Sequence, residues 1–412
     1  MKRHTASPQG QWAEFGGSTQ SQAVRCGEMV FVSGQMDIDE AGTPIHPGDL
    51  AAEMQGAANR LASALGEVGL GLGHVTKLLC VYVSDGSRDE AEILLLLAAA
   101  LPPGLEPAVT AVPVPYLVCE GANVMLDAYA MAREDGGMLL RQSFQPEGVA
   151  PLPKGFATTV RCGKMIFVSG QSPVTEEGAL LYPDDIVAQT REVMARIRLA
   201  LAAAGADLQD VVKINRWYAG SGSVEDFEPA ALACAANFAE PGPAATGIPI
   251  PRHAHEGQMI RIEVVAMRAE DGSRLPRRSV WPDSLWDWTV ELPYWHGLKC
   301  HDMIFLGGQV SLDTAGRAVN PHDMRAQAAQ AMVHIGSILR EIGAGYSNIC
   351  KLTTQYTGAP GQKALEQHMR IRSGFFDVPG PASTNIALPV LAYPGMIIEI
   401  DAFAMAEPDR QT

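Results

Sequence analysis

The sequence predicts an α+β protein made of three copies of one domain, each a mixed β-sheet with two helices on one face. The first observation behind this prediction is a repeated segment: residues 24–35 recur at 160–171 and, more loosely, at 298–309. The copies end 136 and 138 residues apart, which is the spacing of whole domains rather than of solenoid repeats. The second observation is that later segments keep the same offsets, so each repeat contains a complete fold.

The repeated segment is expected to form an opening strand in each copy. Residues 29–32 and their counterparts are β-branched, apolar or aromatic and stop at a Ser-Gly or Gly-Gly pair, which is typical of a strand closed by a turn. Further strands are expected at 77–83, 213–218 and 351–356, and the last strands at 124–131, 260–267 and 398–405.

Two helices are expected between these strands. In repeat 2, Val193, Ile197 and Leu201 recur at the spacing of one helix face, and the run ends at Gly205, a residue that favours helix ends. The second helix is expected at 89–100, 224–238 and 363–376. This order of elements predicts a sheet with helices on one face only.

Such a sheet leaves its other face uncovered. Three half-covered sheets bury these faces together when they pack around a threefold axis with the helices outside. We therefore expect an intramolecular pseudotrimer of domains 16–133, 154–269 and 292–408, joined by linkers 134–153 and 270–291. Both linkers are rich in Gly, Pro and charge and long enough to wrap from one domain to the next.

Composition limits the class of partner. The net charge of −15 opposes binding to nucleic-acid phosphates unless a local basic patch exists, and the only visible group of arginines is Arg274, Arg277 and Arg278 in the second linker. No apolar run reaches bilayer length and the start of the chain lacks the order of a secretory signal, so we expect a cytoplasmic protein without nucleic-acid or membrane partners. The odd number of cysteines, 7, argues against a disulfide framework.

The shared string V-x-x-G-x-M-V-F-V-S-G-Q, followed by a helix, a V-V-K triplet, a Pro-Ala pair and an acidic final strand, resembles the RidA/YjgF family of enamine and imine deaminases. The resemblance covers nearly the whole chain, three times over, and is strongest in repeat 2. It implies the family's homotrimer fused into one polypeptide, with sites in the clefts between domains. It also implies water addition to a 2-imino or 2-enamino acid with release of ammonia.

One family position with a known role is changed in every copy. The Arg that grips the substrate carboxylate follows the Pro-Ala pair in the family, and the corresponding residues here are Val109, Ala245 and Ser383. None of these side chains is positively charged, so the usual bidentate grip on a carboxylate is missing. Ordinary imino-acid deaminase activity therefore depends on another group taking over this role.

The resemblance also implies candidate residues that remain. The family's water-orienting Glu lies on the last strand, and only repeat 3 keeps it, as Glu399. The aromatic residue that lines the neighbouring cleft corresponds to Tyr294 in repeat 3. The Ser-Gly pair of repeat 2, Ser169 and Gly170, is expected to present polar and backbone groups to a cleft, whereas repeat 3 has Gly307 in place of the serine. The three clefts therefore cannot be equivalent.

The acid two residues beyond the family's Glu position is present in every copy. It is Asp127, Glu263 or Asp401, and we expect it to serve structural hydrogen bonding.

The Pro-rich turn of repeat 2 contains a cluster of polar residues. Arg252 could hold a substrate carboxylate from a new direction, and His253 could act as acid or base near neutral pH; a solvated loop is the alternative. His253 and His255 beside Glu256 could also ligate zinc, but no third, distant ligand is evident. We therefore expect no metal and no cofactor.

Two further arginines of repeat 2 lie within expected strands. Arg216 and Arg261 could both point into the central space between the domains. A buried Arg must be paired, and Glu263, Glu399 or an anionic ligand could pair it.

These observations predict a hydrolytic deaminase or hydrolase that acts on a small imine, enamine or amide-like metabolite in one specialised interdomain cleft. We expect a single-chain pseudotrimer that is monomeric or weakly self-associating. Two alternatives stay open: a non-catalytic small-molecule binding or scaffold protein, and a cyclic amide hydrolase of the cyanuric acid hydrolase or barbiturase type, whose Ser-Lys pairs are not recognisable here. Nucleotide-binding and nucleophile-elbow motifs are absent from the sequence.

Overall fold

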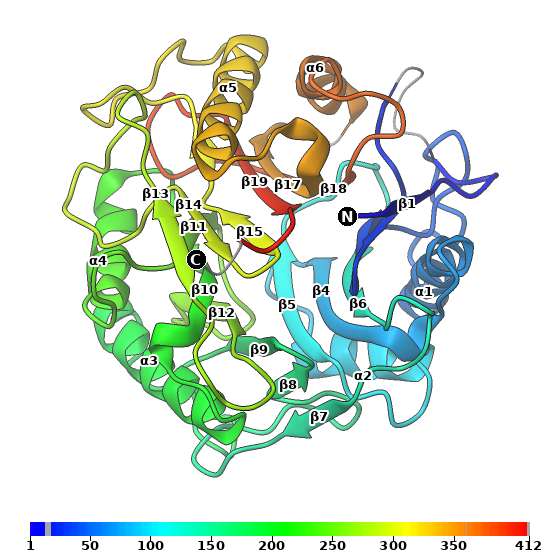
Figure 1. Cartoon of the computed structure of the whole chain (residues 1–412). Coiled ribbons are helices and arrows are strands. Elements are labelled where there is room, and N and C mark those ends of the chain that lie inside the picture. Colours follow the sequence, from blue (N-terminus) through cyan, green and yellow to red (C-terminus); the bar gives the residue numbers. More distant parts are fainter. Residues whose placement is uncertain (13–17, 360, 410–412) are drawn as a thin grey trace.

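The computed structural model of the chain describes residues 1–12, 18–359 and 361–409, and for Gln362 only the backbone. The first two residues of the expected first domain, 16 and 17, lie outside the described part. Within it the three repeats fold into three similar sheets, and Figure 1 shows them arranged around a common centre with the helices outside.

The elements of each repeat follow one order. Repeat 1 contains β1 (Arg3–Ala6), β2 (Ala23–Cys26), β3 (Met29–Gln35), α1 (Leu50–Glu67), β4 (Val75–Val83), α2 (Glu90–Ala100), β5 (Ala108–Val114) and β6 (Val124–Met131). Repeat 2 contains β7 (Arg141–Phe144), β8 (Thr159–Cys162), β9 (Met165–Gln171), α3 (Ile186–Ala203), β10 (Val211–Ala219), α4 (Val224–Ala235), β11 (Ala244–Ile250) and β12 (Ile260–Met267). Repeat 3 contains β13 (Arg277–Val280), β14 (Gly297–Cys300), β15 (Met303–Leu306), β16 (Gln309–Val310), α5 (Met324–Ile342), β17 (Ile349–Thr357), α6 (Gln362–Ser373), β18 (Ala382–Leu388) and β19 (Ile398–Met405).

The strand order is the same in each sheet. In repeat 1 it is β1-β2-β3-β6-β4-β5, where only β4 and β5 pair in parallel. The outermost strands β1, β7 and β13 were not expected, and β7 and β13 lie in the two linkers. Each linker therefore adds an edge strand to the next sheet before the repeated segment begins.

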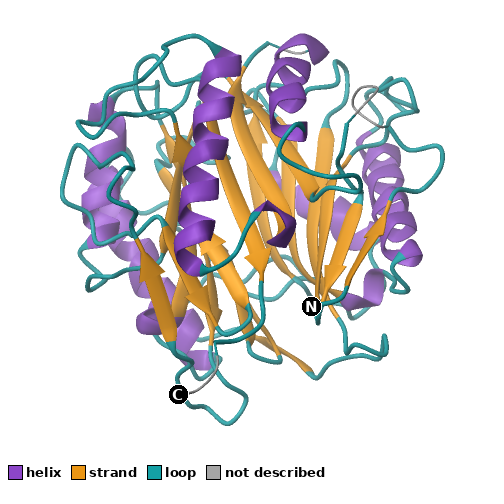
Figure 2. Cartoon of the chain, turned by 45° about the horizontal axis from the view of Figure 1, so that its top comes forward, coloured by secondary structure: helices purple, strands orange, loops and turns teal. Residues whose placement is uncertain are grey.

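The helices begin and end where local chemistry favours it. Asp49, Asp185 and Asp323 precede the first helix of each repeat, and each accepts a hydrogen bond from a backbone N–H of the first turn. Helix α5 ends at Gly343, whose φ of 83° is in the left-handed region that glycine tolerates. Figure 2 shows that these helices cover the outer side of the sheets, as the sequence predicted. None of the helices in the described part of the chain combines the length and the apolar character that crossing a bilayer requires.

The inner faces of the sheets meet in a shared apolar cluster. Phe31, Phe167 and Phe305 are equivalent residues of β3, β9 and β15, and all three are fully buried. Tyr129 of repeat 1 packs its ring 5.4 Å from Phe31 and 5.4 Å from Phe403 of repeat 3. Because aromatic rings bury a large apolar area, this cluster covers the face that each sheet would otherwise expose.

A buried ion pair connects each repeat to the next. Lys77 of repeat 1 pairs with Glu263 of repeat 2 at 2.9 Å, Lys213 of repeat 2 pairs with Asp401 of repeat 3, and Lys351 of repeat 3 pairs with Asp127 of repeat 1 at 2.6 Å. The three pairs close a ring, which agrees with the threefold packing expected from the sequence.

A threonine completes each pair, and we call the resulting three-residue unit the clasp. The second residue after each Pro-Ala pair is a threonine: Thr110, Thr246 or Thr384. Each threonine donates its hydroxyl hydrogen to the acid of the next repeat. Lys213 also donates to Thr246 Oγ1 at 2.7 Å and to the backbone oxygen of Leu306 at 2.9 Å. The expected structural role of the three acids is therefore confirmed.

Lys213→Met should destabilise the folded chain strongly, because Asp401 would remain buried without its cation. We expect the free energy of unfolding to fall by about 3–5 kcal/mol, measured by urea denaturation. Lys363→Met, at an exposed lysine of α6, is the matched control and should change stability by less than about 0.5 kcal/mol. The double variant Lys213→Met/Asp401→Asn should recover much of the loss, and an unchanged single variant would rule out the clasp as a major contact.

Candidate functional site

Three clefts lie between the repeats, where the strand after a Pro-Ala pair approaches the strand that carries the Ser-Gly-Gln or Gly-Gly-Gln segment. Cleft 1/2 joins β5 to β9, cleft 2/3 joins β11 to β15, and cleft 3/1 joins β18 to β3. Isolated bridges at Ala108 and Ala157, Gly242 and Tyr294, and Ser21 and Ala382 mark the same three contacts. The three clefts therefore occupy corresponding positions between the repeats, but the residues that line them differ.

Cleft 2/3 differs from the other two clefts because it lacks the serine of the Ser-Gly-Gln segment. Ser169 Oγ accepts a hydrogen bond from Val109 N in cleft 1/2, and Ser33 Oγ accepts one from Ser383 N in cleft 3/1, both at 2.8 Å. In cleft 2/3 the equivalent residue is Gly307, where an added Cβ would lie 2.8 Å from the backbone oxygen of Ala245. The two strands of cleft 2/3 therefore approach too closely for a serine.

Arg216 of β10 lies in cleft 2/3 and is 1% exposed. Its guanidinium carbon lies 5.3 Å from the ring centre of Phe227 on α4 and 5.5 Å from that of Tyr294 of repeat 3. None of its three guanidinium nitrogens has a hydrogen-bond partner among the described residues. A buried cation held only by ring faces is costly, which makes this side chain a candidate for binding an anion.

Arg216 lies close to Ala245, the position at which the family has its carboxylate-binding arginine. Arg216 pairs in register with Gly247 of β11, two residues beyond Ala245 on the same face of that strand. A Cβ at Gly247 would lie 3.2 Å from Arg216 Nη2 and 2.7 Å from the ring of Phe227, so glycine provides the room that both side chains use. A guanidinium group therefore lies on the strand next to the one that carries Ala245.

Glu399 of β19 reaches cleft 2/3 from the opposite side. Its carboxylate lies against Gly308, where an added Cβ would be 1.9 Å from Oε1, and Oε2 has no hydrogen-bond partner among the described residues. Burial, together with the nearby carboxylate of Asp401, raises the pKa of Glu399 to about 8, although the charges of Lys213 and Arg216 oppose this shift. Glu399 is therefore mainly protonated at neutral pH and can act as a hydrogen-bond donor.

Aromatic side chains surround these two groups. Tyr218 follows Arg216 on the same face of β10, and its pKa is raised, first by burial and then by the charge of Glu399. Trp288 of the second linker stacks on Phe227 with an angle of 15° between the ring planes, and Tyr393 of repeat 3 packs 5.5 Å from the same ring. Aromatic side chains thus lie around both Arg216 and Glu399 in cleft 2/3.

The second linker also contacts both repeats that form this cleft. Trp286 Nε1 donates to Gln309 Oε1 of repeat 3 at 3.3 Å, and Thr289 Oγ1 donates to Glu228 Oε1 of repeat 2 at 2.8 Å. We call residues 286–289 the strap. The strap therefore contacts repeat 3 at one end and α4 of repeat 2 at the other, beside cleft 2/3.

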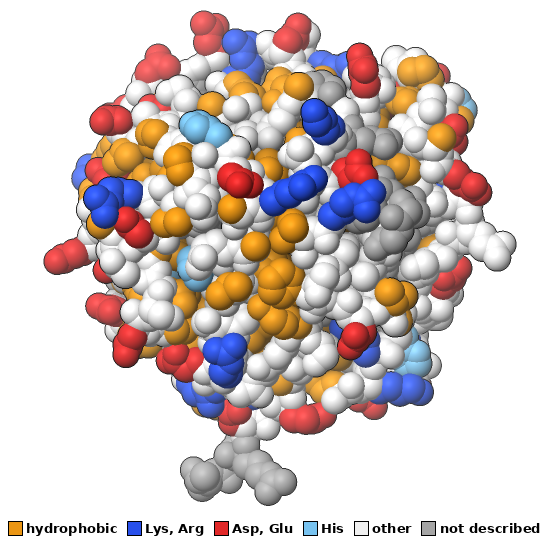
Figure 3. Space-filling view, turned by 90° about the horizontal axis from the view of Figure 1, so that it is seen from above, with side chains coloured by type: hydrophobic (Ala, Val, Ile, Leu, Met, Phe, Trp, Pro, Cys, Tyr) orange, Lys and Arg blue, Asp and Glu red, His pale blue; other side chains and the backbone are white. Residues whose placement is uncertain are grey.

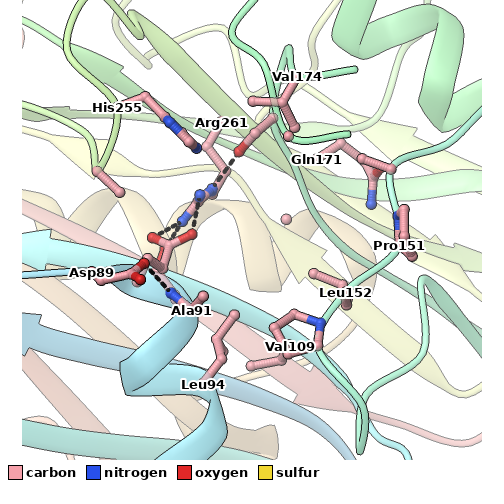
Figure 4. A pocket seen from close by; sticks show the side chains of 18 of the residues that line it. Asp89, Ala91, Leu94, Val109, Pro151, Leu152, Gln171, Val174, His255 and Arg261 are labelled. Atoms are coloured by element: carbon pink, nitrogen blue, oxygen red, sulfur yellow. Dashed lines mark hydrogen bonds and ion pairs between the residues drawn. The ribbon is translucent and has the colours of Figure 1, made fainter. Parts of the chain in front are cut away.

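Cleft 1/2 contains a cavity and a different charge arrangement. Arg261 occupies the position that is Glu399 in repeat 3, and it forms a bidentate ion pair with Glu90 of α2, at 2.7 and 2.5 Å. The Nε of Arg261 donates to Ser172 Oγ, and Tyr82 donates its hydroxyl hydrogen to Glu90. Figure 4 shows Arg261 at one end of a cavity of about 490 Å³ that Gly170 also lines. Here the cation and the acid neutralise each other.

Cleft 3/1 retains an arginine but not the acid. Met125 stands at the Glu399 position, with its sulfur next to Gly34. Arg372 of α6 is buried and donates to Thr354 and to Asn385 Oδ1, the latter at 2.8 Å. Thr354 and Asn385 correspond to Arg216 and Gly247, so this cleft carries its cation on the second helix. Within the described part of the chain, cleft 2/3 is therefore the cleft that has a glutamate at position 399 or its equivalents. Its arginine, Arg216, forms no hydrogen bond with this glutamate.

The structure separates several residues that the sequence grouped together. Arg216 and Arg261 do not share the central space, because Arg216 lies opposite Ile262 in the β10–β12 register and Arg261 lies opposite Trp217. The two arginines consequently project from opposite faces of the sheet. Glu263 pairs with Lys77 and not with either arginine.

The Pro-rich turn of repeat 2 lies on the side of cleft 1/2. Arg252 is exposed and donates to the backbone oxygen of Asp85 in repeat 1. His253 is buried, and burial followed by the charge of Arg261 lowers its pKa well below the usual value, so it stays neutral. His255, rather than His253, lines the cavity beside Arg261 (Figure 4). Both Arg252 and His253 are thus placed on the opposite side of repeat 2 from Glu399.

Two charged residues of the clefts, Glu90 and Arg372, were not predicted from the sequence. Both lie on the second helix of their repeats, where the copies diverge most, so the alignment marks no shared position for them. The acidic first turn of α2 was the available signal for Glu90, but it also fits ordinary helix capping.

Two other chemistries have little support from the structure. Among the described residues no group of three or more His, Cys, Asp or Glu side chains is placed to hold a metal ion. The linker arginines are engaged in local contacts: Arg274 pairs with Asp207, and Arg277 and Arg278 donate to backbone oxygens. On the face seen in Figure 3, basic side chains are interspersed with acidic ones and form no continuous basic surface.

Comparison with known proteins places these repeats in a family. The family model described as endoribonuclease L-PSP matches residues 18–132, 149–268 and 288–406. A RutC family protein of Pyrococcus horikoshii is 30% identical over 120 residues, which are 29% of this chain and 92% of that protein. A 2-iminobutanoate/2-iminopropanoate deaminase of Capra hircus is 28% identical over 117 residues, or 28% of this chain and 82% of that enzyme.

A solved structure also resembles the whole arrangement. A chorismatase crystal structure aligns with a TM-score of 0.51 and 14% identity, covering 81% of this chain and 93% of the chorismatase. At this identity the likeness concerns the fold. The three matches of the family model cover most of the sequence, and the chain therefore belongs to the endoribonuclease L-PSP family, the RidA/YjgF family of its sequence resemblance, as three fused repeats.

Proposed function

We propose that the protein is a hydrolytic deaminase that acts in cleft 2/3 on a small imine or enamine bearing a carboxylate. The observation that carries this proposal is the juxtaposition of Arg216, whose guanidinium has no hydrogen-bond partner among the described residues, with Glu399, an acid whose pKa is raised to about 8. Relatives named as 2-iminobutanoate/2-iminopropanoate deaminase and 3-aminoacrylate deaminase support this substrate class.

Arg216 would bind the substrate carboxylate. A guanidinium can donate two parallel hydrogen bonds to a carboxylate, and the rings of Phe227 and Tyr294 already fix its plane. Binding would supply the anion that this buried cation lacks, so substrate affinity would come partly from relieving the cost of an unpaired charge.

Glu399 would carry the proton transfers. The protonated carboxyl donates its proton to the imine nitrogen, which makes the adjacent carbon more electrophilic. Water then adds to that carbon and gives a proton to the Glu399 carboxylate, forming a carbinolamine. Glu399 then returns this proton to the nitrogen, the C–N bond breaks as the carbinolamine hydroxyl gives its proton to the Glu399 carboxylate, and ammonia and a 2-oxo acid are released with Glu399 protonated again. A raised pKa suits a group that must act as acid and then as base near neutral pH.

The strap would control access to this site. Arg216, Tyr294 and Glu399 are all buried, so a substrate must enter by displacing part of their surroundings. Trp288 is only partly buried and stacks on Phe227, which makes it the side chain best placed to move aside. Closure over the substrate would then exclude bulk water from the imine.

Glu399→Gln should reduce ammonia release from 2-imino acids by about 100-fold or more, because the amide cannot transfer protons. The measurement is ammonia release from a panel of imines generated in place from amino acids, coupled to NADH oxidation by glutamate dehydrogenase. Met125→Leu, at the equivalent position of cleft 3/1, is the matched control and should keep wild-type rates. No turnover with any imine would favour the non-catalytic binding protein instead.

The same assay gives a pH dependence with a defined sign. Because the pKa of Glu399 is raised to about 8, its acid form predominates below that pH, so kcat/KM should fall as the pH rises through about 8. The residual activity of Glu399→Gln should not show this step. A wild-type profile that is flat between pH 6 and pH 9 would argue against Glu399 as the proton donor.

Arg216→Met and Arg261→Met should differ in their effect on stability. The first removes a buried cation that has no hydrogen-bond partner among the described residues, so Tm should stay the same or rise while kcat/KM falls by about 100-fold, the value of a charged bidentate contact. The second leaves Glu90 without its cation and should lower the free energy of unfolding by about 1–3 kcal/mol. Thermal unfolding measures both, and a strong loss of stability in Arg216→Met would show that Arg216 has a structural role.

A further inference from the structure

The cavity of cleft 1/2 is built from repeat 1, repeat 2 and the linker between them. The start of α2 and the strand β5 come from repeat 1, residues 150–153 come from the first linker, and β9 and the 254–255 turn come from repeat 2. Its volume of about 490 Å³ falls within the range of small-molecule sites in proteins. This cavity is separate from cleft 2/3 and has no part in the proposed deamination.

One end of the cavity carries paired charges of both signs. Arg261 and Glu90 form the bidentate pair described above, and the side chain of Glu90 remains 17% exposed. Arg88 and Asp89, the two residues before Glu90, line the same cavity and add a second cation and a second anion. Arg196 of α3 also lines the cavity but pairs with Glu192 at 2.9 Å, so the positive and negative groups at the cavity, counted with this partner, balance.

The other end of the cavity is apolar. Figure 4 shows Leu94 of α2, Val109 of β5 and Leu152 of the linker on the side opposite Arg261, and Val174 also lines the cavity. Aliphatic side chains of this size favour a branched aliphatic group and provide no hydrogen bonds for a polar one.

We propose that this cavity binds an aliphatic α-amino acid as a zwitterion. Its carboxylate would lie toward Arg261 and Arg88, its ammonium group toward Glu90 and Asp89, and its side chain on the apolar wall. A ligand with both charges leaves the site neutral, whereas a carboxylate alone or an amine alone adds an uncompensated charge beside the buried Arg261. The ion pair thus selects for a dipolar ligand.

The site is arranged for binding rather than for turnover. Both carboxylate oxygens of Glu90 accept hydrogen bonds from Arg261, and one of them also accepts the Tyr82 hydroxyl. Both oxygens of this carboxylate are thus occupied by partners within the site. This inference does not depend on the reaction proposed for cleft 2/3.

Isothermal titration of the full chain with three matched probes tests the proposal. L-leucine, isovalerate and isopentylamine share the branched side chain and carry both charges, the carboxylate alone and the amine alone. We expect L-leucine to bind with 1:1 stoichiometry and the two singly charged probes to bind at least about tenfold more weakly. Leu152→Trp, which fills the apolar end from the linker, should abolish leucine binding, and its Tm checks that the variant is folded.

A second variant locates the bound amino acid. Arg216→Met alters the other cleft and should leave leucine binding unchanged. The proposal is overturned if isovalerate binds as tightly as leucine, if leucine shows no binding to folded wild-type protein at millimolar concentrations, or if Arg216→Met rather than Leu152→Trp abolishes binding. These binding measurements do not depend on ammonia release, so they test the amino-acid site even if the protein shows no deaminase activity.

Discussion

The buried clasp of lysine, threonine and acid is the contact on which the rest of the structure depends. It occurs three times, and each copy joins one repeat to the next. Each clasp acid lies two residues beyond the variable position 125, 261 or 399 on the same strand. Because side chains two residues apart share one face of a strand, the clasp also directs the variable residue into the cleft. One interaction, repeated three times within the chain, therefore joins the repeats and orients the residues that distinguish the clefts.

Fusion of three repeats into one chain allows these sites to differ. A homotrimer changes all its clefts with each mutation, whereas this chain has an acid at 399, an arginine at 261 and a methionine at 125. The carriers of the positive charge differ as well: the final strand in cleft 1/2, the strand β10 in cleft 2/3 and the helix α6 in cleft 3/1. The linkers add to the asymmetry, since the cavity of cleft 1/2 and the strap beside cleft 2/3 each use linker residues. Different chemistry in each cleft follows from one shared scaffold.

Sequence reasoning was accurate where a pattern repeats three times. The last strands were predicted with the bounds that the structure has, and the structural role of the acids at 127, 263 and 401 was identified. It was less accurate where the decisive quantity is register or a contact between distant segments. The opposite projection of Arg216 and Arg261 depends on how β10 pairs with β12, and the Glu90 contact joins residues 171 positions apart. Edge strands in the linkers were missed because their short polar sequences resemble loops.

We propose that, among the described residues, those of cleft 2/3 supply the carboxylate-binding and proton-transfer groups of a deaminase. A crystal structure of the protein soaked with 2-oxobutanoate, the stable product of 2-iminobutanoate hydrolysis, tests it most directly. The account predicts the carboxylate of the bound molecule within hydrogen-bond distance of Arg216, with its 2-oxo group near Glu399, and no equivalent molecule beside Met125. Binding in all three clefts, or binding away from Arg216, would contradict it.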